Sequence, residues 1–152
     1  MKHRIQCDKE AGVILVTLEG TASADGFRGL VEDLLRPPCS EVDFPILSDF
    51  RALDMSSMTS KEIRRIAEFV ASLRTDILPI RHAIVVGHAL SYGFTRMYQL
   101  LADGRDPQQI RVFYGYEDAR AWLGVGDGPR EMENGAGDMG DGGAARPVAT
   151  DD

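Results

Sequence analysis

Val13-Ile14-Leu15-Val16-Thr17-Leu18 is the stretch that decides the fold, because it is apolar on both sides of a β pleat. A strand of this kind is typical of a sheet that is covered on both faces. Ala83-Ile84-Val85-Val86 repeats the pattern, and an amphipathic segment with helical spacing follows each run. Strands that alternate with single helices predict a mostly parallel sheet with right-handed crossovers.

The same reasoning extends over the rest of the chain. We expect strands at residues 4–8, 13–18, 44–49, 83–86 and 110–113, and helices at about 23–36, from Thr59, from Ser91, and around Trp122. The first strand, joined by a short turn, is expected to be an antiparallel edge strand. The prediction is an α/β domain over residues 1–124, with a mixed, mostly parallel five-stranded sheet and four helices. The pattern leaves the strand order open.

Charge is concentrated at the end of the chain. The formal net charge is −7, and residues 125–152 hold seven acids, two bases and seven glycines. We therefore expect a disordered Gly/Asp-rich acidic tail at 125–152. Without a basic stripe, the composition argues against a nucleic-acid partner.

Two cysteines are too few for a disulfide scaffold, and no stretch is long enough and apolar enough for a membrane span. We expect a cytoplasmic protein with reduced thiols. The histidines and cysteines lack the spacing of metal ligands, so neither a metal nor another cofactor is predicted.

Ala89-Leu90-Ser91-Tyr92-Gly93 is close to the nucleophile elbow of α/β-hydrolases. That fold requires a histidine after the serine, whereas His88 is the last histidine of this chain. The simpler interpretation makes Ser91 the N-cap of a helix. No complete nucleophile, base and orienting group can be assembled, so we predict no catalytic residue and a protein that is not an enzyme.

The segment from Ser48 to Met58 is expected to leave a strand and to carry serines to the start of a helix. A phosphate on such serines would meet helix-terminal amides and could act as a switch. The alternative is a polar connecting loop in which Asp49 and Arg51 form a local ion pair.

Over residues 1–124 the chain resembles the STAS/SpoIIAA-like superfamily, and most closely its small bacterial members of unassigned role, which are grouped with CRAL-TRIO lipid-binding domains. The segments that carry the resemblance are Leu47-Ser48-Asp49-Phe50-Arg51, Arg81-His82-Ala83-Ile84-Val85-Val86, Tyr92-Gly93-Phe94-Thr95-Arg96-Met97-Tyr98, Val112-Phe113 and Glu117-Asp118-Ala119-Arg120-Ala121-Trp122-Leu123.

Anti-sigma-factor antagonists of this superfamily have a phosphorylatable serine in an Asp-Ser-Ser-Gly segment at the second helix. The corresponding stretch here is Asp54-Met55-Ser56-Ser57-Met58, which has an inserted Met55 and a methionine in place of the glycine. The resemblance implies the fold, and a regulatory or binding module rather than a catalyst.

Two function hypotheses follow. The first is a regulatory, protein-binding module whose partner surface is the segment from Asp54 to Met58, with Met55 and Met58 exposed as an adaptable apolar patch. The alternative is a carrier of a small lipid or anionic metabolite, bound by the loops at the carboxyl ends of the parallel strands. The candidate ligand-binding residues are Asp49, Arg51, His88, Ser91, Tyr92 and Arg96. Arg96 could meet an anion, or could instead pair with an acid such as Asp49.

Aromatic residues gather around the final strand, at Val112-Phe113-Tyr114 and Tyr116. A strand late in the order often lies at a sheet edge, which must be covered or paired. We expect a weak homodimer through this edge.

Overall fold

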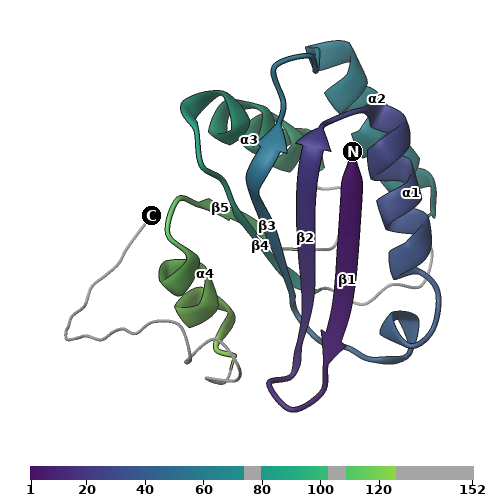
Figure 1. The fold of residues 1–152 in the computed structure, drawn as a ribbon. Coiled ribbons are helices and arrows are strands. Elements are labelled where there is room, and N and C mark those ends of the chain that lie inside the picture. The colour runs from purple at the N-terminus through teal and green to yellow at the C-terminus, as the bar shows by residue number, and fades with distance from the viewer. Residues whose placement is uncertain (74–79, 103–108, 126–152) are drawn as a thin grey trace.

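The described part of the chain forms an α/β domain with a mixed five-stranded sheet and four α-helices, which confirms the predicted fold class. The computed structural model describes residues 1–73, 80–102 and 109–125 (Figure 1). The elements in chain order are β1 (Lys2–Asp8), β2 (Val13–Thr21), α1 (Ala24–Leu34), the short 3₁₀ helix η1 (Cys39–Glu41), β3 (Ile46–Asp54), α2 (Ser60–Leu73), β4 (Arg81–Val85), α3 (Ala89–Ala102), β5 (Gln109–Phe113) and α4 (Tyr116–Leu123). The predicted tail lies outside the described residues, apart from Val125.

The strands lie in the sheet in the order in which they occur in the chain, β1-β2-β3-β4-β5. β1 pairs antiparallel with β2, as predicted, and every other pair is parallel. Right-handed crossovers that always advance in one direction place their helices on one face of the sheet. Accordingly α1, α2 and α3 share one face, and α4 lies on the other (Figure 1).

Both faces of the central strands are buried, as the continuous apolar runs predict. Alternate residues of a strand point to opposite faces, so Ile14 and Val16 pack under α1–α3 while Val13 packs with α4. The larger cluster lies between the sheet and α1–α3. The smaller cluster joins Val13, Leu47, Ala83, Val85, Ala119 and Leu123.

The starts of α1 and α2 agree with the helices predicted from about residue 23 and from Thr59, whereas the predicted cap of α3 is wrong. Ser23 precedes α1 and accepts a hydrogen bond from the Gly26 amide at 3.0 Å. Thr59 precedes α2 and accepts one from the Glu62 amide at 3.2 Å. The prediction that Ser91 is an N-cap is wrong, because α3 begins at Ala89 and places Ser91 inside the helix, 1% exposed.

β3 is longer than predicted and runs to Asp54. The reason is its partner: β2 continues to Thr21 and pairs with β3 as far as Asp54, after a register shift between Thr17 and Glu19. The interpretation of Ser48 onward as a loop is therefore wrong for its first half. Asp49 and Arg51 lie within a strand.

β5 lies at the edge of the sheet, as expected. Beyond it Tyr114 is 55% exposed and stacks on Tyr92, with ring centroids 5.0 Å apart. Pairing of a second copy along this edge stays a prediction.

Candidate functional site

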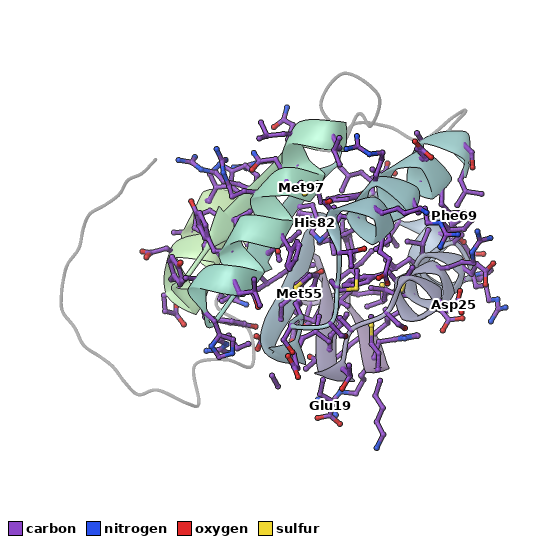
Figure 2. The ribbon with its side chains drawn as sticks, turned by 90° about the horizontal axis from the view of Figure 1, so that it is seen from above. Glu19, Asp25, Met55, Phe69, His82 and Met97 are labelled. Carbon is purple, nitrogen blue, oxygen red and sulfur yellow. The ribbon has the colours of Figure 1, made fainter. Side chains whose placement is uncertain are left out.

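A cavity of about 380 Å³ lies between the sheet and helices α1–α3. Its size falls within the range of pockets that enclose small molecules. In Figure 2, which shows the molecule from above, Met55 and His82 lie in the interior and line the cavity, whereas Glu19 lies at the periphery of the molecule. The cavity lies nearer the amino ends of the parallel strands, since Ile46 and Ile80 belong to its wall.

Each of the three helices contributes an apolar stripe to the cavity wall. The stripes have the three- and four-residue spacing of a single helical face. Phe27, Leu30 and Leu34 come from α1, Ile63, Ile66 and Val70 from α2, and Phe94 and Tyr98 from α3. The sheet supplies mainly Ile14, Ile46, Phe50 and Ile84. The wall is thus predominantly hydrocarbon.

One polar pair interrupts this hydrocarbon wall on the sheet side. The Ser48 hydroxyl and Nε2 of His82 are 2.8 Å apart and hydrogen-bonded. Ser48 belongs to β3 and His82 to the neighbouring β4, where His82 is in register with Ile46. Ser48 is 2% exposed, so the pair lies in a largely dehydrated setting.

A serine hydrogen-bonded to a histidine can act as a nucleophile with its base, but catalysis also needs donors for the developing oxyanion. Leu47, Ser48 and Asp49 are each in register with residues of both β2 and β4. Their backbone amides therefore belong to the sheet ladders and do not converge on an oxyanion.

Other polar groups at the cavity are already engaged or lie at its rim. The Thr95 hydroxyl donates to the Ser91 carbonyl at 2.8 Å, a bond within α3. Asp43 is exposed and contributes to the lining. Among the described residues, neither lysine nor arginine lines the cavity.

The predicted ligand-binding residues Asp49 and Arg51 form an ion pair on β3, which confirms the local pair considered for this segment. Nε and one terminal nitrogen of Arg51 donate to the two carboxylate oxygens at 2.9 and 2.7 Å. Burial alone would raise the pKa of Asp49, but the hydrogen bonds and charge of Arg51 hold it below its ordinary value. The Arg51 guanidinium also lies 5.2 Å from the Tyr116 ring centroid.

A second, smaller hollow of about 200 Å³ adjoins this ion pair on the α4 side of the sheet. Arg4, Gln6, Thr17, Asp49 and Tyr116 are among its lining residues. It is polar and lies on the face opposite the larger cavity.

Most of the remaining candidates at the strand ends have partners of their own. Arg96 donates to Gln99 at 2.7 Å on the same helix, so the alternative pairing with Asp49 is wrong. Tyr92 stacks on Tyr114, and Ser91 is buried within α3. His88 lies close enough to Asp54 for its charge to contribute to lowering the pKa of that carboxylate, after the larger effect of hydrogen bonds from Ser56.

The segment from Asp54 to Met58 differs from expectation in its methionines. Met55 is 3% exposed and Met58 5% exposed, so the predicted exposed methionine patch is wrong. Both side chains join the apolar cluster beneath α1–α3, and Met55 lines the cavity. Ser56 and Ser57 are exposed, and the Ser56 amide donates to Asp54 at 2.9 Å.

Sequence reasoning missed the Ser48–His82 pair. Ile46, Ser48 and Phe50 alternate along β3 and face the helices together, so the pattern does place a polar residue on an apolar face. Its histidine partner lies 34 residues away, and only the strand register joins the two.

Within the described ranges, no cluster of three or more metal-ligating side chains is found. No helix among the described residues is long and apolar enough to cross a membrane. No protein-family model matches the chain, and neither a curated protein nor a solved structure shows significant similarity to it.

Proposed function

We propose that this protein binds a small lipophilic molecule, without catalysis, in the cavity between the sheet and helices α1–α3. The observation that carries the proposal is the cavity itself, about 380 Å³ of space with a mainly apolar wall. Cavities with apolar walls bind apolar molecules, because a water molecule inside them finds few hydrogen-bond partners. The proposal keeps the small-ligand hypothesis and moves its site from the strand-end loops into the interior.

The expected affinity follows from buried area. A ligand that loses roughly 200 Å² of apolar surface to such a wall gains about 5 kcal/mol. Association and ordering oppose part of this gain, while close packing adds to it. A dissociation constant between about 1 µM and 1 mM is the expected range.

A regulatory, protein-binding function in the manner of STAS domains is the second candidate, as a cytoplasmic protein with a protein partner. Exposed Ser56 and Ser57, just before α2, favour it. The buried Met55 and Met58 cannot supply its adaptable patch unless the segment unfolds. We therefore rank it below the ligand-binding function.

Filling the cavity tests the proposal. Leu34 and Val70 line the cavity and are partly buried, whereas Leu100 is 65% exposed and outside the lining. With the neutral fluorescent probe N-phenylnaphthylamine, Leu34→Trp or Val70→Trp should weaken binding at least about tenfold, since the indole occupies the ligand's space. The matched control Leu100→Trp should bind as the wild type does.

Circular dichroism establishes that each variant is folded before its affinity is compared. Equal probe affinity in all four proteins, or no probe binding by the wild type, would contradict the cavity as a ligand site. Native mass spectrometry of freshly purified protein adds an independent measurement, because a retained lipophilic molecule appears as added mass.

A further inference from the structure

We infer that the ligand is a neutral molecule with an apolar body and one hydroxyl or carbonyl group, which hydrogen-bonds to the Ser48–His82 pair. The inference rests on the proposed function and adds the chemical class of the ligand. The cavity wall offers the hydrogen-bonding groups of Ser48 and His82, and among the described lining residues it has neither lysine nor arginine.

The pair can serve either kind of polar group. A serine hydroxyl has one donor and two acceptor positions, and the bond to His82 at 2.8 Å uses only one of them. If Nε2 of His82 donates to Ser48, the hydroxyl hydrogen is available to a ligand carbonyl. If Nε2 accepts, the serine oxygen can still accept from a ligand hydroxyl. The tautomer of His82 therefore decides whether Ser48 donates to the ligand or accepts from it, but a hydrogen bond can form in either case.

Because Ser48 of the Ser48–His82 pair is buried, the cavity favours a ligand with a polar group over one without. Ser48 is almost fully buried, and its side chain faces the cavity from the third position of β3. Packing pure hydrocarbon against Ser48 leaves the remaining hydrogen-bonding capacity of its hydroxyl unused in a dry setting, which is unfavourable. A ligand with a polar group at this point avoids that loss.

Charge excludes the anionic metabolite of the earlier hypothesis. A carboxylate entering an apolar cavity loses its hydration and needs a cation in compensation. Among the described lining residues, His82 alone can carry a positive charge, and the exposed Asp43 would repel an anion. Asp43 is also too exposed to stabilise a buried ammonium group strongly.

Three probes of matched size and shape separate these possibilities: methylnaphthalene, naphthylmethanol and naphthoate. Titrations followed by probe fluorescence at neutral pH should rank naphthylmethanol about threefold to tenfold tighter than methylnaphthalene, the range expected for one hydrogen bond. Naphthoate should bind at least about tenfold more weakly than naphthylmethanol. This ranking uses the wild-type protein alone.

Ser48→Ala should remove the preference for naphthylmethanol while leaving methylnaphthalene affinity within about twofold of the wild type. The matched control Ser72→Ala removes an exposed hydroxyl that donates to the Phe69 carbonyl on α2 and lies outside the cavity lining. It should keep the wild-type preference.

Equal affinities for methylnaphthalene and naphthylmethanol, a preference that survives in Ser48→Ala, or naphthoate as the tightest probe would each overturn the inference while leaving binding in the cavity intact. Failure of all three probes to bind would overturn the proposed function, and this inference with it.

Discussion

Replacing Met58 by aspartate distinguishes a buried role for the segment before α2 from an exposed one. Met58 is 5% exposed and packs in the cluster between the sheet and α1–α3. An exposed partner surface would tolerate the aspartate with an unchanged melting temperature. A core residue would not, because the variant both removes apolar contacts and forces a carboxylate into the protein interior.

The expected magnitude follows from these two effects. Truncation of a buried methionine to alanine alone costs about 2–5 kcal/mol. A buried carboxylate adds to this cost, so Met58→Asp should lose more than about 3 kcal/mol of unfolding free energy. For a domain of this size, each kcal/mol lowers the melting temperature by about 3 °C, which predicts a fall of about 10 °C or more.

Thermal and urea unfolding followed by circular dichroism measure both quantities. Ser57→Asp is the matched control, since it places the same charge one residue earlier at an exposed position. It should change stability by less than about 0.5 kcal/mol. A melting temperature for Met58→Asp equal to that of Ser57→Asp would refute the burial of Met58 and restore the exposed patch.

Two further predictions concern titratable groups. Because the folded pKa of Asp49 lies below its ordinary 3.8, the ion pair with Arg51 stabilises the fold above that pH and is lost as the pH falls through the lowered value. Asp49→Asn should therefore cost about 0.5–1 kcal/mol by urea unfolding at neutral pH, and the difference should vanish in strong acid; a constant difference would contradict this. Burial raises the pKa of the Cys39 thiol, and the charge of Cys7 and a hydrogen bond with it raise that pKa further, so the two thiols are neighbours. A mild oxidant should link Cys7 to Cys39 within one chain, and iodoacetamide should modify Cys39 more slowly in folded than in urea-unfolded protein; only intermolecular disulfides, or equal rates, would contradict this.

The parts of the fold that depend on local pattern could be predicted from the sequence. The runs that are apolar on both faces identified the central strands, because a strand covered by helices on both sides has no polar face to show. Thr59 marked the start of α2, because the residue whose side chain caps a helix lies next to that helix in sequence.

The predictions that were wrong concern places where residues distant in sequence determine the local structure. β3 extends to Asp54 because β2 provides backbone partners that far, although Arg51 and Asp54 are exposed and resemble loop residues. Ser91 has a residue type that favours a cap, but α3 begins two residues earlier and packing buries the side chain. Tertiary packing outweighs a local preference of about 1 kcal/mol in such cases.

The candidate site moved for the same reason. The charged residues that suggested a ligand at the strand ends have partners of their own: Asp49 holds Arg51, and Gln99 holds Arg96. An arginine that already has a hydrogen-bond partner binds an anion less strongly.

The cavity, in contrast, requires apolar stripes from three helices that meet over one face of the sheet, and its polar pair requires the register of β3 against β4. A local sequence motif indicates neither of them. The Ser48–His82 pair, at which we propose that a ligand is recognised, joins residues that are 34 apart in sequence and 2.8 Å apart in the fold.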